Sequence, residues 1–183
     1  EMQRRDASSK EELSTFIGQS IFVAILVFLF TLYLGLFRKD YFDKPRSIAM
    51  LYVLITIFPL LVSLMMQHNV FSVYILPFAM APIFIRVFMD SRTAFISHVT
   101  MVLICAAAVR YQYEFIIVQL VAGLVAIYSL RELSKRAQVF KTAILVTISS
   151  MVTFYALQLM QDNDVVELDW AMNYHSLVNG IFL

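Results

Sequence analysis

The feature that most constrains this chain is a series of apolar stretches, each of a length that can cross a lipid bilayer. They cover residues 16–37, 47–66, 70–89, 93–109, 115–130 and 142–160. A membrane-spanning helix needs about 20 predominantly apolar residues, whereas a soluble domain would interleave polar faces with apolar ones. A content of 61% hydrophobic and 15% charged residues is likewise unlike that of a soluble domain. We therefore predict that the chain crosses a membrane several times.

The runs are continuous rather than alternating at every second residue, which favours helices and excludes a β-barrel. A seventh apolar run begins near His175 and reaches Leu183, a length of roughly nine residues against the twenty or so of a span. We predict an all-α, polytopic transmembrane helical bundle over residues 16–183, with six complete spans and the start of a seventh. Because carbonyl groups at a chain end in the bilayer would lack partners, we expect this chain to be part of a longer protein.

The distribution of basic residues predicts the orientation, since cytoplasmic loops are enriched in lysine and arginine. With the N-terminus outside, the inner loops hold ten basic residues: Arg38, Lys39, Lys44, Arg46, Arg86, Arg92, Arg131, Lys135, Arg136 and Lys141. The outer segments hold four: Arg4, Arg5, Lys10 and Arg110. We therefore expect an extracytoplasmic N-terminal side and a cytoplasmic C-terminal side. The net charge of +1 gives no indication of nucleic-acid binding.

The sequence contains none of the usual catalytic patterns. It has no glycine-rich phosphate loop, no paired-cysteine zinc pattern and no nucleophile elbow. Its three histidines are far apart in sequence, and the single Cys105 predicts no intrachain disulfide. We therefore assign no catalytic residue, no metal ligand and no cofactor to this chain.

A few polar residues within the predicted spans are candidates for intramembrane contacts: His98, Gln119, Gln158 and Asn179. Such residues either bridge neighbouring helices or line a cavity, and helix bridging is the more common role. For His98, a ligand contact or a pH switch is the alternative to pairing with a neighbouring helix. Gly123, with Ala122 and Ala126, offers a surface of small residues for close helix approach.

The third span carries the most informative local pattern. Pro77 and Pro82 each remove a backbone donor, so we predict a bent helix over residues 70–89 and take the two prolines as a candidate hinge. Ordinary proline kinks are the alternative. Arg86 and Asp90 are four residues apart, hence on one helical face, and together with Arg92 they form a candidate pairing site at the inner interface.

Three segments carry a resemblance to a known family: FRKDYFDKPRS, LPFAMAPIFIRVFMDSRTAF and QLVAGLVAIYSLRELSKRAQVFKTA. They resemble the membrane region of the bacterial seven-transmembrane HD hydrolases. The proline-rich third span closing on Asp90, Arg92 and Ala94 is the most specific part of the likeness. The resemblance covers residues 16–183.

The resemblance implies a sensor, a membrane region and an enzyme in one protein of the bacterial inner membrane. Residues 1–15 would be the juxtamembrane end of an extracytoplasmic sensor domain. A cytoplasmic HD phosphodiesterase using divalent metals and acting on cyclic di-AMP would follow Leu183. The His and His-Asp metal ligands of that enzyme have no counterpart in this chain.

We therefore interpret the chain as a transmembrane sensing and signal-transducing region. Its expected partners are the lipid bilayer and the covalently linked sensor and hydrolase domains, and no nucleic acid. The oligomeric state is left open, a homodimer included. A small-solute transporter and a passive membrane anchor are the alternative functions, although the sequence lacks the matching interrupted helices of many transporters.

Overall fold

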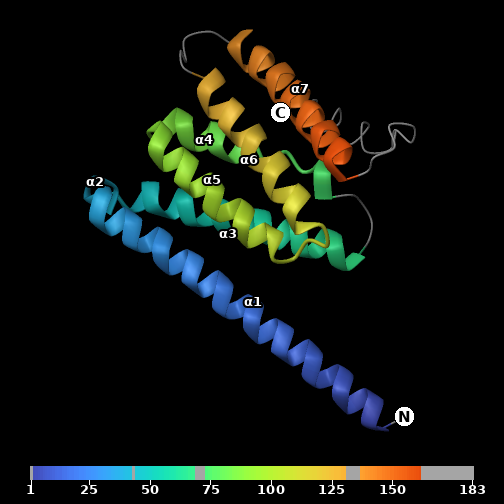
Figure 1. The fold of residues 1–183 in the computed structure, drawn as a ribbon. Helices are drawn as coiled ribbons and strands as arrows, with labels where there is room; N and C mark the ends of the chain where they lie inside the picture. Colours follow the sequence, from blue (N-terminus) through green and yellow to red (C-terminus); the bar gives the residue numbers. More distant parts are fainter. Residues whose placement is uncertain (1, 43, 69–72, 131–136, 162–183) are drawn as a thin grey trace. The chain divides into compact units, whose positions relative to one another are not determined.

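All secondary-structure elements in the described part of the computed structural model are helices (Figure 1). The structure describes residues 2–42, 44–68, 73–130 and 137–161. Within them, four helices are long and apolar enough to cross a membrane: Leu13–Phe37, Pro45–His68, Gln112–Ser129 and Phe140–Met160. Two shorter apolar segments are Val73–Phe88 and Ser91–Ala106. The prediction of an all-α helical bundle is confirmed, and the predicted seventh span near His175 lies outside the described residues.

The chain forms two units, Glu1–Ile48 and Ala49–Leu183. The first contains α1 (Met2–Phe37) and the one-turn helix α2 (Lys39–Phe42). With 36 residues, α1 is about 54 Å long, so it extends well beyond the thickness of the hydrocarbon core, which is about 30 Å. Near the C-terminal end of α1, the rings of Tyr33 and Phe37 stack with their centroids 5.7 Å apart.

The second helix of spanning length, α3 (Pro45–His68), begins with a proline. Pro45 occupies the first helical position, where its missing N–H is not needed by the helix. The buried residues of α3 recur every three or four positions and form one stripe: Leu51, Ile55, Phe58 and Val62. Residues between them, such as Val53 and Leu60, are exposed. One face of α3 therefore packs inward, and the rest is suited to lipid.

The prediction of a single bent helix over residues 70–89 is wrong for residues 73–89, which are the part that the structure describes. A short 3-10 turn, η1 (Val73–Ile75), is followed by a break, and α4 (Met80–Phe88) begins only after Pro77. Proline disfavours a helical conformation in the residue before it, here Leu76, and donates no hydrogen bond itself. Pro82 lies in the first turn of α4, where the helix needs no backbone donor. The prolines therefore separate two helical pieces instead of bending one helix.

Three further helices complete the second unit: α5 (Ser91–Ala106), α6 (Gln112–Ser129) and α7 (Ala137–Gln161). Helix α6 packs against both α5 and α7, and α4 packs against α5 and α6 (Figure 1). A chain of aromatic contacts joins α3 to this group through Phe58, Phe78 and Phe115. The ring centroids are 5.5 Å apart for Phe58 and Phe78 and 5.2 Å apart for Phe78 and Phe115.

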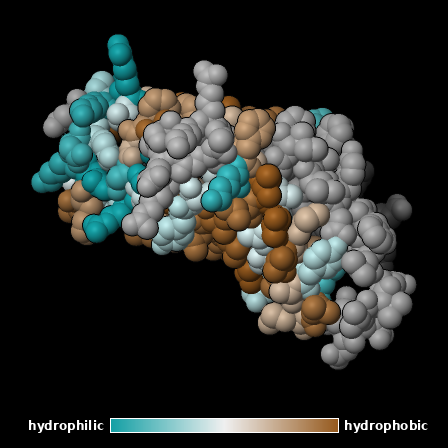
Figure 2. Space-filling model, turned by 90° about the horizontal axis from the view of Figure 1, so that it is seen from above, coloured by the Kyte–Doolittle hydropathy of each residue, from teal (hydrophilic) through white to brown (hydrophobic). Residues whose placement is uncertain are grey.

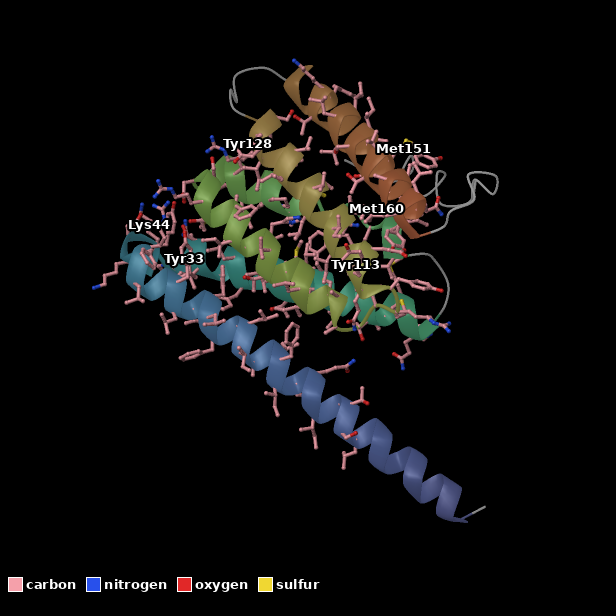
Figure 3. All side chains as sticks on the ribbon, in the orientation of Figure 1. Tyr33, Lys44, Tyr113, Tyr128, Met151 and Met160 are labelled. Atoms are coloured by element: carbon pink, nitrogen blue, oxygen red, sulfur yellow. The ribbon has the colours of Figure 1, made fainter. Side chains whose placement is uncertain are left out.

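The surface also has the character of a membrane protein. On the face drawn in Figure 2, hydrophobic residues form a broad patch on the described surface. Figure 3 labels Tyr113 and Tyr128 near opposite ends of α6, and their side chains are 61% and 71% exposed. Fifteen helical positions separate them by about 22 Å along the axis. Tyrosines so placed match the aromatic belts at the two membrane interfaces.

Asp90 defines the start of α5 as its N-cap. Its Oδ2 accepts hydrogen bonds from the backbone N–H groups of Arg92 (3.1 Å) and Thr93 (3.4 Å). The hydroxyl of Thr93 donates to the other carboxylate oxygen, Oδ1, at 2.6 Å. These bonds satisfy donors that the first turn of a helix leaves without intrahelical partners.

We expect Asp90→Ala to lower the free energy of unfolding by about 0.5–2 kcal/mol, because these donors lose their acceptor. Asp90→Asn keeps an acceptor oxygen and should cost less. Denaturant unfolding in detergent micelles would measure both values. Arg92→Ala is the control, since Arg92 contributes its backbone N–H and its side chain is exposed. Equal stability of Asp90→Ala and the wild type would contradict the capping role.

Candidate functional site

Helix α5 places polar residues in the protein interior. Four of its buried residues are polar: Thr93, Ser97, His98 and Thr100. Inside a membrane, each buried polar group needs a partner from the protein or from bound water, because lipid offers none. Thr93 finds its partner in Asp90, and the hydroxyl of Thr100 donates to the carbonyl of Ile96 at 2.9 Å. His98, in contrast, bonds to a different helix.

The imidazole of His98 crosses from α5 to the backbone of α6. Its Nε2 lies 2.9 Å from the carbonyl oxygen of Gln119. The ring rests directly on Gly123, at a place where an added Cβ would overlap it. In an α-helix the carbonyl of Gln119 points toward the residue four positions on, which is Gly123. A residue with a side chain at that position would therefore block the approach that glycine permits.

The contact also fixes the tautomer of His98. A carbonyl oxygen only accepts hydrogen bonds, so Nε2 must carry the proton and donate it to Gln119. Nδ1 has no hydrogen-bond partner within the described ranges. A proton there as well would bury an unpaired charge in an apolar interior, at high energetic cost. His98 is therefore neutral in this arrangement, with an unshared electron pair on Nδ1.

A second side of α6 faces α7. Ala122 and Ala126 of α6 form a cluster with Val146 of α7 and Ala79, which precedes α4. Near one end of this interface the hydroxyls of Ser129 and Thr142 lie 2.7 Å apart. Small residues four positions apart let helices approach closely, and hydroxyl pairs between helices add to the attraction. The small residues of α6 therefore allow close packing on two sides: Gly123 faces α5, and Ala122 and Ala126 face α7.

The predicted intramembrane residues are distributed over several helices. The structure brings His98 together with Gln119, through the backbone carbonyl of Gln119, and both residues are buried. Gln158 lies half-buried near the end of α7. Asn179 lies outside the described residues. Sequence reasoning passed over Ser97, because serine in membrane helices usually bonds to its own helix and gives no distinctive pattern.

The predicted inner-interface group is arranged differently from expectation. Arg86 and Asp90 do not share one helical face, because α4 ends at Phe88 and Met89 is extended. Asp90 caps α5, Arg92 is exposed in the first turn of that helix, and Arg86 is half-buried in the last turn of α4. In the described part of the chain, Nε of Arg86 has no hydrogen-bond partner. The candidate hinge prolines lie at the break before α4 and in its first turn.

Among the side chains that the structure describes, no three His, Cys, Asp or Glu residues are close enough together to hold a metal ion. Cys105 is buried within α5 and is not in a disulfide. The distinctive chemistry of the described region is therefore the contact between α5 and α6 at His98.

Comparison with known proteins identifies the family. A family model described as "7TM receptor with intracellular HD hydrolase" matches residues 13–183, which is most of the chain. The chain belongs to this family. In the 7TM receptors with an intracellular HD hydrolase, a transmembrane receptor region is linked to the hydrolase, and this chain is accordingly part of a multi-pass membrane protein. No curated protein and no solved structure matches the chain.

Gly123→Ala should destabilise the receptor region by about 1–3 kcal/mol, because the added methyl group overlaps the His98 ring and forces it from its site. The double variant with His98→Ala removes the ring, so it should be less destabilised than the sum of the single changes by about 0.5–3 kcal/mol. Equilibrium unfolding in detergent micelles measures all three variants.

Gly18→Ala supplies the matched control for this cycle. Gly18 also lies in a membrane helix, and an added Cβ there would meet nothing within 4 Å. Alanine at this position should leave the stability unchanged or raise it slightly, since alanine has the better helix propensity. If the two glycine variants are equally stable, or if the effects at His98 and Gly123 are additive, the close contact is not present in the folded protein.

Proposed function

We propose that this chain is the transmembrane sensing and signal-transducing region of a bacterial inner-membrane protein. It would couple an extracytoplasmic sensor domain to a cytoplasmic HD phosphodiesterase that uses divalent metals to hydrolyse a cyclic dinucleotide, cyclic di-AMP. The observation that carries the proposal is the family match over residues 13–183, on a chain whose apolar helices have spanning length.

The charge distribution supports the orientation that this plan requires. Ten of the basic residues lie in the loops and helix ends predicted for one side and four in those predicted for the other, which favours an N-terminal side outside and a C-terminal side in the cytoplasm. A sensor before α1 would then face the periplasm or the cell exterior. A hydrolase following the seventh span would face its nucleotide substrate.

The interior of the second unit supports transduction rather than anchoring alone. A passive anchor needs only apolar helices in lipid, whereas this unit contains a directional contact from His98 to the α6 backbone and a helix break at Pro77. Signal transmission requires two helix arrangements whose relative free energy depends on a bound ligand. Such coupling is typically worth about 1–3 kcal/mol.

The orientation can be tested by cysteine labelling. Lys44 and Arg110 are both exposed and belong to opposite predicted sides, and Cys105, the single cysteine of this chain, is buried. A membrane-impermeant maleimide added to intact spheroplasts should label Arg110→Cys and leave Lys44→Cys unlabelled. Lys44→Cys should react once the membrane is permeabilised. The reverse pattern would overturn the proposed orientation.

The transducing role predicts that changes in the membrane region alter hydrolysis. Pro77→Ala should allow η1 and α4 to join, because it restores a backbone donor at the break. We expect it to change the rate of cyclic di-AMP hydrolysis by the full-length protein in proteoliposomes at least severalfold. Pro82→Ala is the matched control, since position 82 in the first turn of α4 needs no donor.

The outcomes separate the three functions. A changed rate for Pro77→Ala, with normal rates for Pro82→Ala, supports transduction. Equal rates for the wild type and the folded Pro77→Ala protein would favour a passive anchor. Absence of nucleotide hydrolysis combined with solute uptake into the same proteoliposomes would favour a transporter.

A further inference from the structure

Four basic side chains lie close together in sequence where the chain passes from α1 to α3. We call them the basic turn: Arg38, Lys39, Lys44 and Arg46. Two aspartates in the same stretch, Asp40 and Asp43, leave it with a net charge of +2. Of the four basic side chains, Arg38 is half-buried and the other three are exposed. The junction of the two helices therefore presents positive charge to its surroundings.

Backbone hydrogen bonds keep this junction compact. The N–H of Tyr41 donates to the carbonyl of Arg38, and that of Lys44 donates to the carbonyl of Tyr41, each at 3.0 Å. Bonds of this kind hold the first and fourth Cα atoms of a turn within about 7 Å of each other. The guanidinium carbon of Arg38 also lies 5.6 Å from the centre of the Tyr41 ring, as in a cation–π contact. The basic residues on either side of Tyr41 are thus held close together.

Two membrane helices fix the depth of the basic turn. The apolar segment Leu13–Phe37 ends immediately before it, and the segment Pro45–His68 begins within it, so only residues 38–44 separate the two. A link this short cannot carry its side chains far from the membrane surface. Figure 3 labels Tyr33 and Lys44 near the same end of this unit, and tyrosine is typical of the interface between hydrocarbon and water. The basic turn therefore lies at the level of the lipid headgroups.

The headgroup layer supplies a matching partner in its phosphate groups. Guanidinium and ammonium groups donate charge-assisted hydrogen bonds to phosphate oxygens. Basic residues next to a membrane helix attract anionic lipids in particular, because a zwitterionic headgroup carries its own positive charge. A nucleic acid or an acidic protein fits less well, since it would have to reach the side chains within the headgroup layer.

We propose that the basic turn binds the headgroup of an anionic phospholipid in the leaflet that it faces. In the orientation given above, this is the cytoplasmic leaflet. The lipid phosphate would lie against the exposed ammonium groups of Lys39 and Lys44, at the junction of α1 with α3. This surface does not depend on the proposed signalling function, because it concerns only how the first two membrane helices are held at the interface.

Native mass spectrometry of the full chain, released from detergent micelles and titrated with lipid, tests the proposal. The probes are phosphatidylglycerol, which is anionic, and phosphatidylethanolamine with the same acyl chains, which is zwitterionic. We expect the first phosphatidylglycerol to bind at least about fivefold more tightly, which is the contribution of roughly one basic residue beside an anionic surface. Equal affinities for the two lipids would overturn the proposal.

A pair of double variants assigns the preference to the basic turn. Lys39→Gln with Lys44→Gln removes two exposed charges from it and should abolish most of the preference for phosphatidylglycerol. Arg92→Gln with Lys141→Gln is the matched control, because both residues are exposed and belong to the same predicted side. The control should keep most of the preference. Equal losses in the two double variants would show that binding follows the overall charge, and would overturn the proposal.

Two further measurements complete the test. Inorganic phosphate in excess should leave the phosphatidylglycerol bound, and its complete displacement would identify a site for soluble phosphate instead of a lipid. Lys44→Gln alone should lower the preference in the same direction by a smaller factor, and it replaces the double variant if that protein does not fold. A single variant with the affinities of the wild type would then contradict the role of the basic turn.

Discussion

The structure depends on one constraint, which is that hydrocarbon offers no hydrogen bonds to a polypeptide. Each backbone N–H and C=O within the bilayer needs a partner in the protein, and a helix supplies them locally. The hydroxyl groups of the spans obey the same rule. Six of them in the described helices donate to a carbonyl one turn earlier: Ser20, Thr31, Thr56, Thr100, Thr147 and Thr153. Polar residues that depart from this local solution therefore stand out.

Because that constraint is local, the positions of the spans could be predicted from hydropathy alone. The predicted run 115–130 corresponds to α6, Gln112–Ser129, and the run 47–66 to α3, Pro45–His68. The third span could not be predicted in the same way. A proline within an apolar run is compatible with a kink, a break or a helix start, and neighbouring helices decide among them. Here Pro77 marks a break, and Pro82 lies in a helix start.

The candidate site at His98 could be predicted in part, because hydrocarbon offers no hydrogen-bond partner to a polar side chain either. A histidine in an apolar span must find a partner, so His98 stood out as a contact between helices. Its partner could not be predicted, because the acceptor is the backbone carbonyl of Gln119 and not an amide side chain. Any residue of α6 has such a carbonyl. Only the absence of a Cβ at Gly123 makes that of Gln119 reachable, and this requires knowing which face of α6 meets α5.

The contacts of α6 also limit how this part of the protein can move. Gly123 is the single glycine of α6, so the ring of His98 fits at one register of α5 on α6 and at no other. The interface with α7 is built from small apolar residues and one hydroxyl pair, Ser129 with Thr142, near the end of α6. Sliding of α6 along its own axis would displace Gly123 from His98 and Ser129 from Thr142 together. A shift of α5 along α6 therefore requires either that α6 moves with α5 or that the contact of His98 with Gly123 is broken.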